Sequence, residues 1–389
     1  MTRSVDTWLL PDGVADVLPA EAARLEALRR RLLDRFAAWG YQLVFPPLME
    51  YLDSLLTGSG HDLDLMTFKI TDQISGRMMG VRADMTPQVA RLDAHCLPVD
   101  GPARYCYAGT ILNTRPVGLA ASRCPVQIGA ELYGSADVAA DIEVLRLMLD
   151  TLALAGCREL HLDLGHVGIF GGLAQRAGLS ADEETRLFDI YQRKAVAELR
   201  EFLTARPLPD DLQAQFEGLL RLAGPASVLS AARELLAGTS ADIDDALAAL
   251  DAVATALTTS HPGVTLYFDL TELRGYHYHT GLVFAAYTPG ARTELAKGGR
   301  YDHVGEAFGR ARPATGFSAD LKSLLAYFTH DAGTALIVAP AGEDAALLAA
   351  ITRLRSAGET VRQLLPGEAA PATGRHLVAQ AGQWIVMPS

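Results

Sequence analysis

Four short segments of this 389-residue chain carry polar side chains inside stretches whose pattern otherwise predicts strands. Such stretches are half buried in a folded sheet. Burying polar groups without partners is costly, so each segment needs either a ligand or an internal partner. The segments are Val81 to Gln88, Gln127 to Tyr133, Arg274 to Gly281, and Gly298 to Asp302 together with Pro313 to Phe317.

The first two segments gather polar side chains on one face of an extended chain. Arg82 and Asp84 are two positions apart and share a face, although a surface ion pair at a strand end has the same pattern. A polar face with glycine at its centre suits a small ligand lying on a sheet, and a solvated face has that pattern too. In the second segment, the residues on this face are Gln127, Gly129, Glu131 and Tyr133.

The other two segments offer a guanidinium, two histidines and several glycines. Arg274 presents a planar fork that suits a carboxylate. His277 and His279 are two positions apart, but no third ligand lies at a helpful spacing, so we expect no metal site. The glycines lack the GxxxxGK[ST] and GxGxxG spacings of phosphate-binding loops. Tight packing between strands explains them equally well.

Composition and charge restrict the class of protein. The chain is 49% hydrophobic and 21% charged with a net charge of −12, which is typical of a soluble globular protein and works against binding nucleic acid. At about 150 residues per domain, the length predicts two or three domains. The four cysteines form no close pair, the first ten residues lack a signal-peptide core, and no stretch of about 18 residues is free of charge. We therefore expect a cytoplasmic protein without membrane spans.

Hydrophobic periodicity predicts the elements that must position the four segments. Apolar residues at three- and four-residue spacing predict a helix over 21–38 and another over about 137–155, with a left-handed cap at Gly156. Apolar runs and alternation predict strands over residues 41–45, 160–164, 264–269 and 282–287.

Residues 180–258 consist mostly of Ala, Leu, Glu, Asp and Arg, which predicts a helical insertion in a largely antiparallel sheet. Its acidic run, Asp182 to Glu184, suits the first turn of a helix. After a joint at Asp331 to Gly333, residues 334–389 show strand, helix and strand patterns that predict a small α/β unit. The expected fold class is therefore α+β, with residues 1–328 forming one core.

Taken in order, the four segments and the opening Asp12 to Pro19 resemble the catalytic core of histidyl-tRNA synthetases over residues 8–328. The resemblance implies a class II aminoacyl-tRNA synthetase-like fold, an antiparallel sheet with flanking helices. It also implies that the opening segment, the first helix and Phe45 to Glu50 form motif 1, which builds the dimer interface in that family. Gly316 to Leu325 looks like motif 3.

The resemblance also implies a pocket for free histidine. In it, Asp84 is expected to neutralise the α-ammonium, and Gln127 to bond the ammonium or carboxylate. Glu131 is expected to accept from an imidazole N–H, and the Arg274 guanidinium to bind the carboxylate through two N–H groups. The family tyrosine that touches the imidazole aligns with His279, which leaves Tyr278 and Tyr301 as substitutes. The expected histidine-binding residues are Asp84, Thr86, Gln127, Glu131, Arg274, Tyr278, His279 and Tyr301.

The cations with which that family holds ATP are missing. The motif 2 arginine falls on Asn113, the acidic residue two positions on is replaced by Arg115, and the motif 3 arginine falls on Ser323. Adenylation builds negative charge on phosphate oxygens, and losing one preorganised donor costs about 3 to 4 kcal/mol. We therefore expect no adenylation, no catalytic residue and no cofactor.

A histidine pocket without phosphate-binding arginines, followed by a C-terminal unit too short for an anticodon-binding domain, resembles the regulatory-subunit family of ATP phosphoribosyltransferase, the first enzyme of histidine biosynthesis. The resemblance implies a non-catalytic subunit of a hetero-octamer with a short-form catalytic subunit. The resemblance further implies that the regulatory chain is required for activity and for feedback inhibition by histidine, and that it binds no tRNA. Two alternatives are an active histidyl-tRNA synthetase and a histidine-binding paralogue that regulates another protein.

Overall fold

The computed structural model describes residues 9–57, 61–97, 99–116, 122–273, 275–276, 278–329 and 336–388. Arg274 and His277 lie outside the described residues, as does the expected joint at Asp331 to Gly333. The chain forms two compact units, residues 1–329 and residues 330–389.

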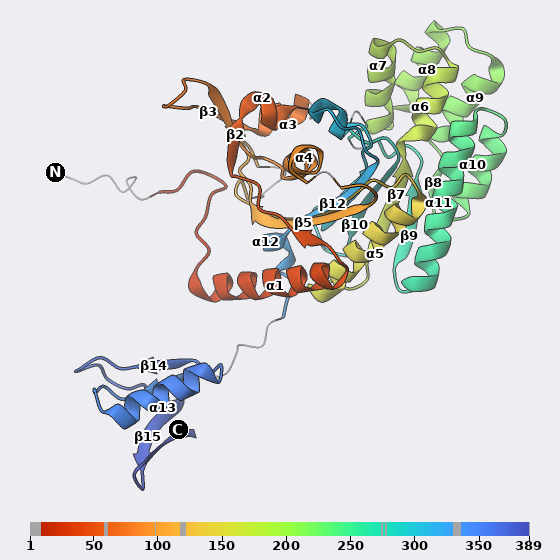
Figure 1. Cartoon of the computed structure of the whole chain (residues 1–389). Helices are drawn as coiled ribbons and strands as arrows, with labels where there is room; N and C mark the ends of the chain where they lie inside the picture. The colour runs from red at the N-terminus through yellow and green to blue at the C-terminus, as the bar shows by residue number, and fades with distance from the viewer. Residues whose placement is uncertain are drawn as a thin grey trace. The chain divides into compact units, whose positions relative to one another are not determined.

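A nine-stranded sheet is the centre of the first unit, in the order β1-β5-β6-β12-β11-β10-β7-β9-β8 (Figure 1). Neighbouring strands run antiparallel except for the parallel pairs β1–β5 and β7–β9, which confirms the expected largely antiparallel sheet. The strands are β1 Gln42–Leu43, β5 Ala103–Thr110, β6 Val126–Tyr133, β7 His161–His166, β8 Ala223–Gly224, β9 Thr265–Asp269, β10 Leu282–Tyr287, β11 Ala296–Arg300 and β12 Ala314–Asp320.

Two long helices, α1 (Pro19–Ala38) and α5 (Val138–Leu154), lie side by side against one face of this sheet (Figure 1). Both were predicted from their apolar stripes. Phe36 at the end of the α1 stripe is fully buried and packs edge-on against Phe317 of β12 at 6.0 Å. Ile128, Ala130 and Leu132 of β6 point into this core. Because successive side chains of a strand point to opposite faces, Glu131 faces the other side of the sheet.

The opposite face carries a smaller layer, in which α4 lies across the sheet from α1 (Figure 1). A three-stranded antiparallel sheet in the order β2-β4-β3 belongs to this layer. The elements of this layer are β2 Met49–Tyr51, α2 Leu52–Leu56, α3 His61–Met66, β3 Phe68–Thr71, β4 Met78–Val81, α4 Thr86–Arg91, the π-helix η2 Leu92–Cys96 and the 3₁₀ helix η3 Val304–Phe308. A further short helix, α12 (Leu321–Leu324), follows β12.

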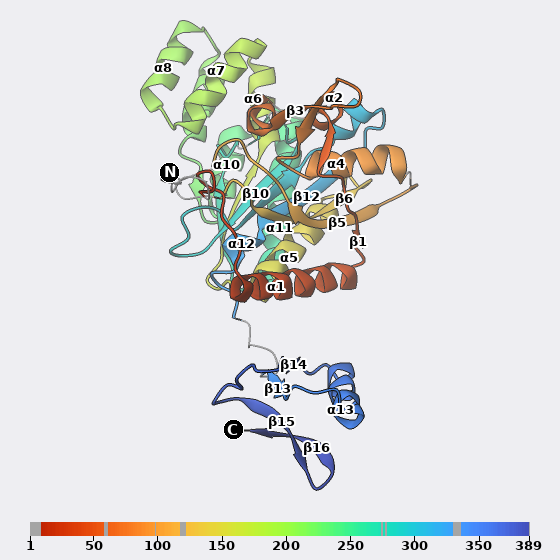
Figure 2. The same ribbon diagram turned by 90° about the vertical axis from the view of Figure 1, so that its left-hand side faces the viewer.

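Residues 167–260 fold into helices interrupted by the short strand β8, as the composition predicts from residue 180 onward. Ser180 and Glu183 form a capping box that starts α7, whose first turn holds the acidic run. In both views α7 and α8 lie at the end of the unit away from α1 (Figures 1 and 2). Among the described helices, none has the length and apolarity needed to cross a bilayer. The helices are α6 Val167–Arg176, α7 Ala181–Gln192, α8 Val196–Ala205, α9 Asp210–Leu219, α10 Val228–Leu236 and α11 Ala241–Ser260.

The second unit is a four-stranded sheet in the order β14-β13-β15-β16. The strand, helix and strand predicted here are β13, α13 and β14, with β13 parallel to both β14 and β15. The antiparallel hairpin β15–β16 was not predicted. The elements are β13 Ile337–Ala339, α13 Ala345–Ser356, β14 Val361–Gln363, β15 Arg375–Gln380 and β16 Gln383–Pro388.

Candidate functional site

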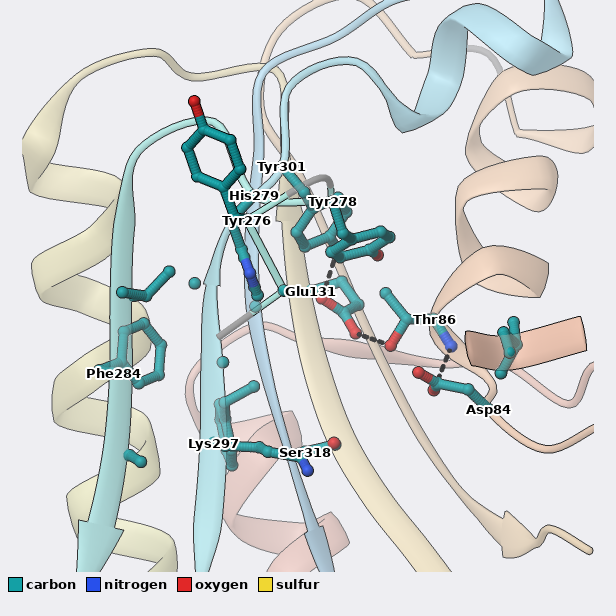
Figure 3. Close-up of a pocket in the computed structure, with 18 of the residues that line it drawn as sticks. Asp84, Thr86, Glu131, Tyr276, Tyr278, His279, Phe284, Lys297, Tyr301 and Ser318 are labelled. Carbon is teal, nitrogen blue, oxygen red and sulfur yellow. Dashed lines mark hydrogen bonds between the residues drawn. The ribbon is translucent and has the colours of Figure 1, made fainter. Parts of the chain in front are cut away.

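A cavity of about 750 Å³ lies on the face of the sheet opposite α1 and α5 (Figure 3). Strands β6, β10, β11 and β12 form its floor, and α3 and α7 contribute apolar side chains. The segment around Asp84 and the loop after Gly275 form further walls. Six of the eight expected histidine-binding residues line it together: Asp84, Thr86, Glu131, Tyr278, His279 and Tyr301.

Glu131 of β6 is the buried carboxyl group of this cavity, and three hydroxyl groups surround it. One carboxyl oxygen accepts from Thr86 Oγ1 at 3.1 Å and from Tyr107 Oη at 2.9 Å, and the other accepts from Tyr301 Oη. Burial raises the pKa of Glu131 from 4.5 to about 8, although the bonds from Tyr301, Tyr107 and Thr86 oppose this shift. The group can therefore exchange a proton with a ligand close to neutral pH.

Glycines in the neighbouring strands make room for this carboxyl group. Gly316 of β12 is paired with Glu131, and a Cβ atom at this position would lie 1.5 Å from Glu131 Oε2. A Cβ at Gly298 would lie 2.0 Å from the carbonyl oxygen of Gly316, and one at Gly299 would lie 2.5 Å from that of Leu282. Close packing of strands thus explains these glycines, the second of the two interpretations drawn from the sequence.

Asp84 is held in place by its neighbours. Its Oδ1 accepts from the backbone N–H of Thr86 at 3.0 Å and from Gln127 Nε2 at 2.8 Å. Gln127 Oε1 in turn accepts from the backbone N–H of Met85 at 2.9 Å. Gln127 is buried and does not line the cavity. Its amide therefore orients the Asp84 carboxylate from behind.

Arg82 does not form the surface ion pair that was one interpretation of its spacing from Asp84. The side chain is buried and donates to the carbonyl oxygens of Thr110 at 3.0 Å and Pro46 at 2.7 Å. The alternative of a solvated polar face on β6 is also wrong, since every residue from Gln127 to Tyr133 is buried.

Aromatic rings form the wall above Glu131 (Figure 3). The Tyr278 ring stacks on Tyr301 with centroids 5.2 Å apart, and His279 meets Tyr278 edge-on at 5.2 Å. Tyr278 Oη is buried and has no hydrogen-bond partner within the described part of the chain. A buried hydroxyl group without a partner costs about 1 to 3 kcal/mol. Tyr278 is therefore a group that a polar ligand atom would satisfy.

The charges that face the cavity favour a cationic ligand group. Among the described lining residues, Asp84, Glu131 and Glu272 are acidic and Lys297 is basic. Lys297 is itself paired with Glu294 at 2.9 Å. Two carboxyl groups at one end, with aromatic walls, suit an ammonium and an imidazole ring rather than a chain of phosphates. In the described chain, no group of three or more His, Cys, Asp or Glu side chains could hold a metal ion.

The three positions that depart from the synthetase ATP site lie outside this cavity lining. Asn113 is buried, and its backbone exchanges two hydrogen bonds with Arg123. Arg115 is exposed. Ser323 is exposed on α12 and donates to Asp320 Oδ2 at 2.8 Å.

The sequence reasoning missed several residues of the site. Tyr107, which donates to Glu131, alternates with apolar residues on β5, and this alternation was a signal that could have found it. Phe188 of α7 and Leu63 and Met66 of α3 also line the cavity. No local pattern marks these three, because their elements reach the cavity only through tertiary packing.

Comparisons with known proteins agree with the resemblance. The histidyl-tRNA synthetase family matches residues 13–324, and the ATP phosphoribosyltransferase subunit HisZ C-terminal domain matches residues 334–387. The ATP phosphoribosyltransferase regulatory subunit of Stutzerimonas stutzeri is 54% identical, covering 99% of both chains.

Solved structures are similar in fold. An ATP phosphoribosyltransferase regulatory subunit/histidyl-tRNA synthetase from Bacillus halodurans is 27% identical, with a TM-score of 0.81 over 94% of this chain and 95% of that one. Histidyl-tRNA synthetase from Nostoc shares the fold at 17% identity, with a TM-score of 0.75 over 94% and 87%. The chain therefore belongs to the family of ATP phosphoribosyltransferase regulatory subunits, which is built on the class II fold of histidyl-tRNA synthetases.

Proposed function

We propose that this regulatory subunit binds free histidine in the cavity around Glu131 and gives a short-form catalytic subunit both its activity and its feedback inhibition. The observation that carries the proposal is the buried Glu131 carboxyl group, which shares one cavity with the Asp84 carboxylate and the Tyr278 hydroxyl group. That hydroxyl group has no hydrogen-bond partner among the residues that the structure describes. We further propose a cytoplasmic hetero-octamer that binds no tRNA.

The proposed pose follows from the charges. The imidazole ring donates an N–H to Glu131, and Tyr278 Oη bonds its other nitrogen, while the α-ammonium faces Asp84. Thr86 links the two ends, because its hydroxyl group donates to Glu131 and its backbone N–H donates to Asp84. Gln127 fixes Asp84, and His279 supports Tyr278. Arg274 is proposed as the carboxylate partner from the sequence resemblance.

Inhibition requires histidine to bind the inhibited arrangement of the complex more tightly than the active one. Such coupling is typically about 1 to 3 kcal/mol and is reciprocal for binding. Phosphoribosyl pyrophosphate should therefore weaken histidine binding in the complex.

Calorimetric titration of the isolated chain with histidine, and then with ATP, tests the proposal. We expect one saturable histidine site and no ATP binding, and no histidine-dependent exchange between ATP and pyrophosphate. Robust exchange would support an active synthetase instead. A short catalytic chain should co-purify with the protein, and its absence would favour a paralogue that regulates another partner.

We also propose self-association through the motif 1 region. The segment from Leu43 to Tyr51 exposes apolar side chains, and Phe45 is 73% exposed. Exposed apolar side chains this close along the chain support an interaction site in this segment. The exposed apolar residues are Leu43, Phe45, Leu48, Met49 and Tyr51.

Phe45→Asp should convert the isolated dimer into monomers, because the substitution buries a carboxylate in the proposed interface. Sedimentation velocity measures the result. Leu365→Asp is the matched control, since Leu365 is 70% exposed in the other unit, and it should leave the dimer intact. A monomeric unaltered chain, or a dimeric Phe45→Asp variant, would contradict the proposed interface.

A further inference from the structure

The loop that carries Tyr278 and His279 also reaches the helical insertion. Between Gly275 and these two residues, Tyr276 points away from Glu131 (Figure 3), and its hydroxyl group donates to Glu184 Oε1 of α7 at 2.5 Å. Glu184 is 92 positions distant in the sequence. One short loop therefore contacts the cavity and the insertion at once.

Ring packing adds to this contact between the loop and the helical insertion. The Tyr276 ring meets Phe170 of α6 edge-on at 4.9 Å and lies 5.7 Å from Phe188 of α7. Phe188 itself lines the cavity. A ligand in the cavity thus faces α7 both directly, through Phe188, and indirectly, through the loop.

Hydrogen bonds and close contacts tie Tyr278 and His279 to Gly275, the residue next to Tyr276. The backbone N–H groups of Tyr278 and His279 both donate to the carbonyl oxygen of Gly275, at 2.7 and 2.8 Å. Gly275 has a φ of +63°, and a Cβ there would lie 2.7 Å from His279 Nδ1. The other side of the His279 ring lies against Gly299 of β11, where a Cβ would lie 2.6 Å from Cδ2. Tyr278 and His279 are therefore bonded to the residue directly before Tyr276.

We propose that Tyr276 is a positioning residue that couples occupancy of the cavity to the position of the helical insertion, with Glu184 as its partner. The inference rests on the proposed histidine site and adds the route by which its occupancy is transmitted. When a ligand atom forms a hydrogen bond with Tyr278 Oη, the rings of Tyr278 and His279 shift toward the ligand. Tyr276 moves with them, and its bond to Glu184 shifts α7. Coupling of this kind needs one element with two arrangements that both sites favour differently.

Tyr276→Phe removes the hydroxyl group that bonds Glu184, and Glu184→Gln removes the charge of its partner. Both substitutions keep the aromatic rings and the fold of the loop. We expect both variants to bind histidine with an affinity within about threefold of the unaltered chain. We also expect the histidine concentration for half-inhibition of the complex to rise about tenfold or more, as the loss of a typical coupling predicts. Histidine should slow amide hydrogen exchange in α7 of the unaltered chain but not of the variants.

Tyr191→Phe is the matched control, because it removes a hydroxyl group that donates to the Phe216 carbonyl oxygen at 2.7 Å within the same insertion. It should leave both the inhibition and the exchange difference in α7 unchanged. If Tyr276→Phe and Glu184→Gln keep normal inhibition and exchange, or if affinity and inhibition fall in parallel, the coupling role is overturned. Failure of the unaltered chain to bind histidine would instead overturn the proposed function, and this is measured first.

Discussion

Glu131→Gln should weaken histidine binding by about 30-fold or more. Removing one partner of a buried, hydrogen-bonded charge pair costs about 2 to 5 kcal/mol, and each 1.4 kcal/mol is a factor of about ten. The glutamine keeps the shape of the carboxyl group, and its one oxygen can still accept from hydroxyl groups on one side. It cannot release a proton, so it cannot become the negative charge that balances an imidazolium. Calorimetric titration of the isolated chain measures the effect.

The matched control is Glu143→Gln. Glu143 of α5 pairs with Arg104 at 2.7 Å and accepts from Tyr41, away from the cavity lining, so its variant should bind histidine normally. Feedback inhibition should weaken in Glu131→Gln and also in Arg274→Ala, while the complex still assembles. Normal affinity and inhibition in Glu131→Gln would show that histidine binds elsewhere.

The stability of the isolated chain should depend on pH through the same carboxyl group. Burial holds the pKa of Glu131 at about 8 in the folded chain, against 4.5 as the usual value. Between these values the folded chain binds a proton that the unfolded chain has lost. The contribution of Glu131 to stability is therefore fully present below pH 4.5 and is lost as the pH rises through 8. The total change is about 5 kcal/mol, at about 1.4 kcal/mol per pH unit.

Urea unfolding of the unaltered chain and of Glu131→Gln, between about pH 5.5 and 9, measures this contribution. The free energy of unfolding of the unaltered chain, relative to the variant, should fall by about 1.4 kcal/mol per unit up to pH 8 and then level off. Burial also raises the pKa values of Asp93 and Asp141, but both groups are common to the two proteins and cancel. Parallel stability curves would show that Glu131 is ionised throughout.

The sequence by itself determined the elements whose evidence is local. Leu28, Leu32 and Phe36 repeat at helical spacing, and the fully buried stripe of α1 consists of these residues. Alternation over Gln127 to Tyr133 likewise placed Glu131 on a face different from Ile128, Ala130 and Leu132. The order of the motifs was enough to indicate the family, because it follows the path of the chain through the fold and does not depend on any single contact.

Only the tertiary structure decided what surrounds each polar group. Arg82 donates to carbonyl groups 28 and 36 positions away, and Gln127 supports Asp84 instead of lining the cavity. The elevated pKa of Glu131 and the bond between Tyr276 and Glu184 also arise from residues far apart in the sequence. Periodicity records which face of an element is buried. It does not record which other element covers that face, and the covering element sets both the hydrogen-bond partners and the cost of a charge.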